Sequence, residues 1–169
     1  PARGGVFAGR EPRGSRPVLT DMTAPLKVLV ADDETIIAMG IETTLAKMGH
    51  AVVGRARTGG EAVAKAVELS PDLVIMDVKM PDMDGIEASR RILAHRAVPI
   101  VILSAYSDSD LIERADAVGV SNYLVKPVTE ADLRPALTLA ISRFRQLHAL
   151  EEEVGRVMSR VTSDVVTLQ

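Results

Sequence analysis

Acidic, hydroxyl and lysine side chains follow several apolar runs of the sequence, at the points where those runs end. Asp32 and Asp33 come directly after the run LKVLVA at 26–31. Three later apolar runs end on the polar residues Asp77, Ser104 and Lys126. Clustered carboxylates repel unless a positive charge compensates them, and an all-oxygen ligand set favours Mg²⁺ or Mn²⁺ over zinc. Acids, a cation, a hydroxyl and a lysine together are typical of a phosphoryl-transfer site with a carboxylate nucleophile.

This chemistry requires elements that bring the side chains to one place. From Leu26, short apolar runs alternate with amphipathic stretches, which predicts an α/β fold with a five-stranded parallel doubly wound sheet. The predicted strands are 26–31, 51–56, 72–76, 99–103 and 122–125. The predicted helices are 34–48, 59–69, 85–95, 108–118 and a long helix opened by residue 129. In the strand order 2-1-3-4-5, the ends of strands one and three are neighbours, so their acids share the crevice where such sheets bind ligands.

Each of these residues also has an ordinary structural explanation. Asp32 and Asp33 could cap the following helix, since acids suit helix N-termini. Asp77 could be a turn residue, Ser104 a structural hydroxyl and Lys126 a surface lysine. For any single residue this alternative stays open, but the coincidence of all five at one sheet edge favours a site.

Four sequence blocks resemble the signature blocks of bacterial response-regulator receiver domains, the CheY-like family. The blocks are VLVADDE (28–34), DLVIMDVKMPDMDG (72–85), VILSA (101–105) and YLVKP (123–127). Their order, spacing and strand placement agree with the family, and the resemblance covers 26–145. It implies a flavodoxin-like receiver that accepts a phosphoryl group from a sensor histidine kinase. It also implies no enzymatic activity beyond self-phosphorylation and self-dephosphorylation.

The resemblance assigns the phosphoacceptor and the metal site to particular residues. Asp77 is the expected phosphoacceptor. Asp33, Asp77 and the backbone carbonyl of Lys79 are expected to bind Mg²⁺ or Mn²⁺ directly, with Asp32 holding the metal through water. A cis peptide bond is expected at Lys126–Pro127.

The resemblance also implies how the phosphoryl group is held and how it is detected. Ser104 and Lys126 are expected to bind the phosphoryl group. Ser104 and Tyr123 are the expected switch residues. Lys79 and Tyr106 occupy the positions that tune loss of the phosphoryl group in this family.

The first 25 residues differ from the rest in composition. Residues 1–25 hold four arginines, four glycines and four prolines with little apolar periodicity, which predicts a disordered tail. Met22 is a candidate natural start, and a weak nucleic-acid arm is the alternative interpretation of the basic stretch.

Composition excludes several classes of function. The 169 residues include no cysteine, which excludes disulfides and thiolate metal sites, and the three histidines stand far apart. The apolar runs are too short to cross a membrane, so a cytoplasmic protein is expected. The net charge is −3 and only 2% of residues are aromatic, which argues against a nucleic-acid surface.

The last helix carries an apolar stripe that continues beyond the predicted domain. Its residues recur in steps of three and four, and only one of them is polar: Leu137, Ala140, Phe144, Leu147, Glu151, Val154, Met158, Val161, Val165 and Leu168. This pattern predicts a coiled-coil extension over 146–169 and a parallel homodimer. The expected dimer contacts are Phe144, Leu147, Val154, Met158 and Val161. A frayed or truncated end is the alternative, because VTSDVV (161–166) is a poor helix former.

Two further functions remain as alternatives. SRFRQLHALEEEV (142–154) is similar to response regulators of the antiterminator (ANTAR) class, in which a coiled-coil linker leads to an RNA-binding domain. The alternative is therefore an RNA-binding antiterminator regulator truncated before its effector domain. Residues 143–169 carry four arginines against four acids, so no nucleic-acid partner is expected for the chain as given. A magnesium-dependent aspartyl phosphatase or phosphotransferase is less favoured, because the connections are too short for a substrate cap.

Overall fold

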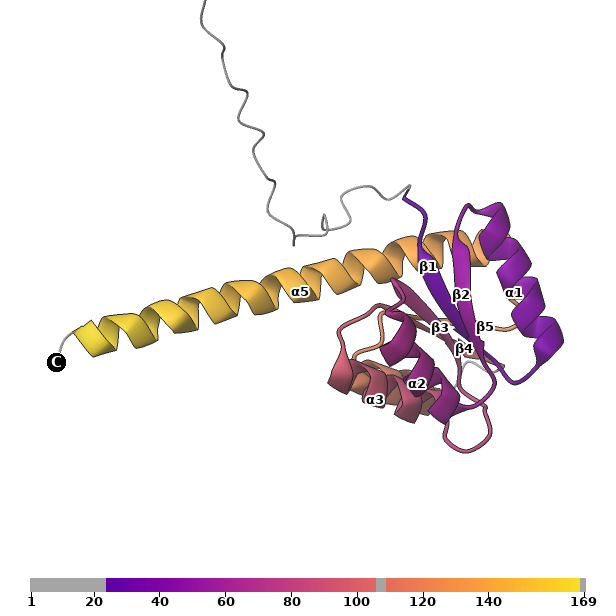
Figure 1. Cartoon of the computed structure of the whole chain (residues 1–169), viewed down its shortest axis with the longest axis horizontal. Coiled ribbons are helices and arrows are strands. Elements are labelled where there is room, and N and C mark those ends of the chain that lie inside the picture. Colours follow the sequence, from indigo (N-terminus) through magenta and orange to yellow (C-terminus); the bar gives the residue numbers. More distant parts are fainter. Residues whose placement is uncertain (1–23, 106–108, 168–169) are drawn as a thin grey trace, which may run out of the picture.

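The computed structural model describes residues 24–105 and 109–167, and within them five strands alternate with five helices (Figure 1). The strands are β1 (Lys27–Ala31), β2 (Ala51–Ala56), β3 (Leu73–Asp77), β4 (Ile100–Ser104) and β5 (Asn122–Val125). The helices are α1 (Thr35–Lys47), α2 (Gly59–Leu69), α3 (Gly85–His95), α4 (Ser109–Val118) and α5 (Glu130–Thr167). Each predicted boundary that falls on a described residue agrees with these ranges to within one residue, and the predicted helix start at 108 lies outside the described residues. The predicted tail 1–25 lies almost wholly outside the described residues.

The five strands form one parallel sheet in the order β2-β1-β3-β4-β5, which confirms the predicted fold class. Apolar side chains alternate between the two faces because successive strand residues point in opposite directions. On β3, Leu73 and Ile75 pack into the core beneath α1 and α5, whereas Val74 and Met76 pack beneath α2 and α3. Burial on both faces explains why β3 and β4 are apolar along nearly their whole length.

The register of the sheet brings the ends of its strands to one edge. Ala31 of β1 pairs with Met76 of β3, one residue before the end of that strand. Asp77 pairs with Leu103, and Ser104 pairs with Val125. The polar residues that follow or end these strands therefore share the carboxyl edge of the sheet, where β1 and β3 meet at the switch of winding direction.

Side-chain caps fix the helix starts that adjoin this edge. Asp84 accepts a hydrogen bond from the backbone N–H of Glu87 at 2.8 Å, which begins α3. At the start of α5, the carboxylate of Asp132 accepts hydrogen bonds from both the backbone N–H and the hydroxyl of Thr129. The Lys126–Pro127 peptide bond between β5 and α5 is cis, as predicted.

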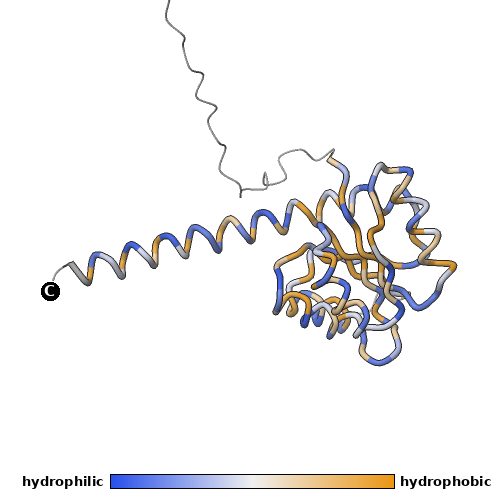
Figure 2. Tube along the Cα trace, in the orientation of Figure 1, coloured by the Kyte–Doolittle hydropathy of each residue, from blue (hydrophilic) through white to orange (hydrophobic). Residues whose placement is uncertain are grey.

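The long helix α5 leaves the domain after covering the sheet. Its first part packs through Leu133, Leu137 and Ile141, whereas every described side chain from 146 to 165 is exposed. Figure 1 shows this part as a straight projection from the domain, and Figure 2 shows hydrophobic and hydrophilic residues alternating along it. Among the described residues, no helix is both long enough and apolar enough to cross a bilayer.

Candidate phosphoacceptor and metal site

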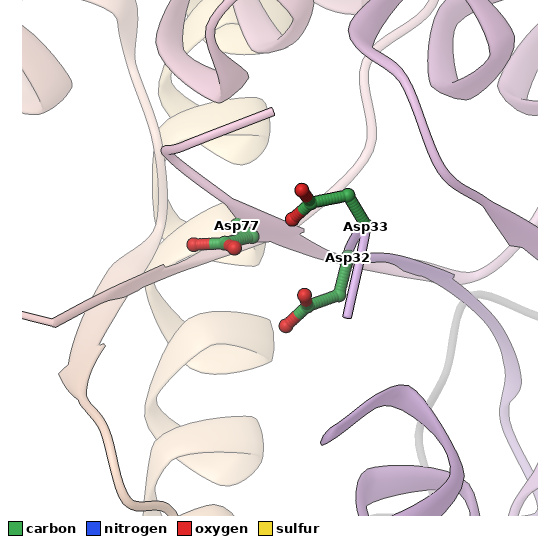
Figure 3. Close-up of side chains that lie close together, drawn as sticks. All are labelled: Asp32, Asp33 and Asp77. Atoms are coloured by element: carbon green, nitrogen blue, oxygen red, sulfur yellow. The ribbon is translucent and has the colours of Figure 1, made fainter. Parts of the chain in front are cut away.

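Three carboxylates converge at the carboxyl edge of the sheet. Asp32 and Asp33 follow β1, and Asp77 is the last residue of β3. One oxygen from each carboxylate lies within 4.8 Å of the other two, and Figure 3 shows the side chains facing a common space. Asp32 and Asp77 are buried, whereas Asp33 is partly exposed. The structure thus brings together the three acids that the spacing predicts at one edge.

Lys126 bridges two of these acids from the opposite side. Its ammonium donates hydrogen bonds to Oδ2 of Asp32 at 2.8 Å and to Oδ2 of Asp77 at 2.9 Å. The side chain is only 12% exposed. The backbone N–H of Lys126 also donates to the carbonyl of Ser104 at 2.8 Å, which holds the residue at the end of β5. The sequence predicts Lys126 beside Asp77, but its equal contact with Asp32 appears only in the structure.

The backbone around Asp77 is held by close packing against the start of α3. The N–H of Gly85 donates to the carbonyl of Val78 at 2.8 Å, which closes the loop after β3. A Cβ atom on Gly85 would collide with the backbone carbonyl of Asp77. Only glycine allows this approach, so Gly85 sets the position of the candidate phosphoacceptor.

Electrostatics at the site act in opposite directions on Asp77. Burial raises the pKa of the Asp77 carboxyl, and the neighbouring Asp32 charge adds to this effect. The hydrogen bond from Lys126 opposes the shift without cancelling it, so the pKa stays above its ordinary value. Burial would lower the pKa of Lys126, but its bonds to Asp32 and Asp77 outweigh burial and raise that pKa. The lysine is therefore firmly cationic, while Asp77 is a carboxylate with raised basicity.

A cavity of about 440 Å³ opens over these groups. Five of the predicted site residues line it: Asp33, Asp77, Lys79, Ser104 and Lys126. Glu34 and Leu111 also line the cavity. Glu34 belongs to the block VLVADDE, which assigns it no role, and Leu111 belongs to none of the four blocks. The position of Glu34 next to Asp33 is the sequence signal for it, whereas Leu111 reaches the cavity from α4 and only the packing of that helix reveals it.

The donor set suits a divalent cation. Three ionised carboxylates against one ammonium leave two negative charges in the cluster. All candidate ligands are oxygens, which favours a hard cation such as Mg²⁺ or Mn²⁺. Lys79, whose backbone carbonyl the resemblance assigns to the metal, lines the same cavity.

One described residue that the sequence predicts for the switch stands apart from this cluster. Tyr123 lies on β5 opposite Ile102, and its side chain is 39% exposed. Tyr123 is not part of the cavity lining. Tyr106 lies outside the described residues, so its predicted role stays a prediction.

Asp32 also has the helix-starting role that is its ordinary structural explanation. Its Oδ1 accepts a hydrogen bond from the backbone N–H of Glu34 at 2.9 Å, just before α1. Its Oδ2 meets Lys126, so the same carboxylate orders the start of the helix and contributes to the cluster. Asp33 is not the helix cap, because that position belongs to Glu34.

Comparison with known proteins agrees with the geometry. Residues 28–138 match the response regulator receiver domain family. The transcriptional regulatory protein PdtaR of Mycobacterium tuberculosis (strain ATCC 25618 / H37Rv) is 49% identical over 141 residues, which cover 83% of this chain and 69% of PdtaR.

Solved structures agree as well. A LuxR-family two-component response regulator from Aurantimonas sp. SI85-9A1 superposes with a TM-score of 0.67 at 30% identity, over 70% of this chain and 86% of that one. The CheX–CheY–BeF3–Mg²⁺ complex from Borrelia burgdorferi gives a TM-score of 0.65 at 27% identity, over 71% of this chain and 90% of the matched chain. The sheet order, the acid cluster and these matches together show that the chain belongs to the response regulator receiver domain family.

Proposed function

We propose that this chain is a phosphorylation-controlled switch in which Asp77 accepts a phosphoryl group from the phosphohistidine of a sensor histidine kinase. The observation that supports the proposal most directly is the setting of Asp77. It is a buried carboxylate of raised pKa that lines a cavity and accepts a hydrogen bond from the ammonium of Lys126. A nucleophile of raised basicity beside a fixed cation suits attack on a phosphoryl group.

The proposed transfer exchanges one bond for another. An oxygen of the Asp77 carboxylate attacks phosphorus, the new O–P bond forms, and the N–P bond to the donor imidazole breaks with its electron pair leaving on nitrogen. The ammonium of Lys126 already donates a hydrogen bond to Asp77 and stays beside the charge that develops on the phosphoryl oxygens. Ser104 lines the same cavity, so its hydroxyl is placed to donate a hydrogen bond to one of them.

Asp33 and Asp77, with the backbone carbonyl of Lys79, would hold Mg²⁺ or Mn²⁺, and Asp32 would support the cation from its buried position. When bound, the cation would neutralise the two charges that Lys126 leaves uncompensated and would stabilise negative charge on the phosphoryl group. The CheX–CheY complex from Borrelia burgdorferi contains both Mg²⁺ and beryllium fluoride, which supports a cation next to the phosphoryl group here.

Phosphorylation would be sensed through Ser104 and Tyr123. Ser104 ends β4 next to the cavity, and Tyr123 lies on the neighbouring strand β5 with its side chain partly exposed. Movement of Ser104 toward the phosphoryl group would favour one of two pre-existing conformations of the β5 face. Lys79 and Tyr106 would tune loss of the phosphoryl group.

Output would pass through the end of the chain. The chain would comprise a receiver at 26–145 and a helical coiled-coil extension at 146–169, and two chains would form a homodimer through this extension. The name of PdtaR, a transcriptional regulatory protein, favours control of gene expression and keeps the antiterminator alternative in place. The partner kinase and the switch would act in the cytoplasm, with no catalysis beyond self-phosphorylation and self-dephosphorylation.

A small phosphodonor such as acetyl phosphate tests the proposal without the kinase. Intact-mass spectrometry should show the addition of one phosphoryl group in the presence of Mg²⁺ and none with a chelator. The Asp77→Asn variant should gain nothing under either condition. Equal incorporation by the wild type and the Asp77→Asn variant would refute Asp77 as acceptor, and turnover of a phosphomonoester would favour the phosphatase alternative.

A further inference from the structure

The projecting part of α5 carries a stripe of exposed aliphatic side chains. Seven of them are 54–64% exposed: Leu147, Leu150, Val154, Val157, Met158, Val161 and Val165. At about 1.5 Å per residue the stripe runs about 27 Å along the helix. Figure 2 shows apolar and polar residues alternating along this stretch. The homodimer proposed above would cover this stripe, and the choice of residues at its centre fixes how the two helices pack.

Two heptad registers can be drawn through the stripe, and each contains one acid. The register through Leu147, Glu151, Val154 and Met158 buries Glu151. The register through Leu150, Val157 and Asp164 buries Asp164. A parallel dimer would place each acid against its own copy, and two buried like charges repel without a compensating cation.

An eleven-residue repeat avoids both acids. The steps of three, four and four lead through Leu147, Leu150, Val154, Met158, Val161 and Val165. Residues eleven apart repeat the same position: Leu147 with Met158, Leu150 with Val161, and Val154 with Val165. Such a repeat corresponds to about 3.67 residues per turn, close to the straight helix, so its supercoil is slight and right-handed.

A second copy of this chain is the partner that the charges favour. Along residues 143–165 four arginines balance four acids, so the helix attracts no strongly charged partner and does not repel its own copy. The six residues of the repeat are all uncharged, which makes the stripe self-complementary. Isolated helices need a packed apolar face for stability in water, and no described part of the domain covers this one.

We infer that two chains pair in parallel along this eleven-residue repeat, with Leu150 rather than Glu151 and Val165 rather than Asp164 at the interface. The inference deepens the proposed homodimer and rests on it. Phe144 precedes Leu147 by three residues, so it lies about 60° around the helix from Leu147, at the edge of the interface. Its ring stacks on His148 of its own helix with centroids 5.7 Å apart. Val157 flanks the interface on the other side.

The absence of natural cysteine allows a direct test in the full chain. Four single variants, Leu150→Cys, Glu151→Cys, Asp164→Cys and Val165→Cys, are exposed to a mild oxidant, and covalent dimer is measured over time. Disulfides need Cα atoms closer than about 7 Å, so interface positions should cross-link at least about tenfold faster than their neighbours. We expect rapid cross-linking at 150 and 165, and slow cross-linking at 151 and 164.

Each other outcome contradicts the inference in a distinct way. Rapid cross-linking at both 151 and 165, or at both 150 and 164, would establish one of the heptad registers. Equal rates at all four positions would show that no register is specified. Cross-linking between the 150 and 165 variants only when they are mixed would show antiparallel helices. A monomeric mass in sedimentation, without cross-linking, would instead refute the homodimer itself.

Discussion

When no metal is bound, Lys126 is the cation that compensates the charges of Asp32 and Asp77. Its ammonium touches both Asp32 and Asp77, and all three side chains are largely buried. A buried carboxylate without a compensating positive charge costs several kcal/mol, and removal of the lysine leaves two such groups.

We therefore expect Lys126→Ala to lower the free energy of unfolding by about 3 kcal/mol in the presence of a chelator. Added Mg²⁺ should recover part of this loss, because the cation would compensate the same carboxylates. Urea denaturation measures both effects. Lys79→Ala is the matched control, since that exposed lysine should change stability little; equal losses in both variants would contradict the account.

Asp77 makes stability depend on pH in a direction unusual for an acid. Its pKa is raised in the folded protein by burial, so the folded state holds its proton more tightly than the unfolded chain does. The group's contribution then falls as pH rises from about 3.8, its ordinary value, through the raised folded pKa. We expect this decline in metal-free wild type and its absence in Asp77→Asn. Identical pH profiles of unfolding for the two proteins would show that folding does not raise the pKa of Asp77.

At the scale of elements, the junction between β3 and α3 positions the acceptor. Gly85 starts α3 against the carbonyl of Asp77, where a Cβ atom has no room. Gly85→Ala must shift either the helix or the strand end, and we expect a loss of about 2 kcal/mol or more in stability. Phosphoryl incorporation should fall as well. Gly155→Ala, where a Cβ meets open space, is the control and should be neutral or stabilising.

The sequence alone predicts the elements, because β3 and β4 are buried on both faces and form continuous apolar runs. The convergence of Asp32 and Asp77 followed from strand order alone. The bond from Lys126 to Asp32 joins residues 94 apart and depends on a side-chain conformation, so no local pattern indicates it. Leu111 reaches the cavity through the position of α4, which sequence periodicity does not specify.

At the scale of the whole molecule, the projecting helix α5 links the switch to its output. Val154 belongs to every register that the stripe allows, and its side chain is 61% exposed in the single chain. We expect a dimer by analytical ultracentrifugation and a monomer for Val154→Glu, which would place two carboxylates face to face. Circular dichroism should show the receiver intact in this variant. A wild-type monomer both with and without beryllium fluoride and Mg²⁺ would contradict the proposed output.

The proposed switch depends on Asp77 being the residue that carries the phosphoryl group. Borohydride reduces an aspartyl phosphate to homoserine, so treatment after incubation with acetyl phosphate and Mg²⁺ marks the acceptor permanently. Peptide mapping by mass spectrometry should find homoserine at position 77, and none when Mg²⁺ is chelated. Homoserine at Asp32 or Asp33 instead, or a phosphorylated protein without any reduced aspartate, would contradict the central claim.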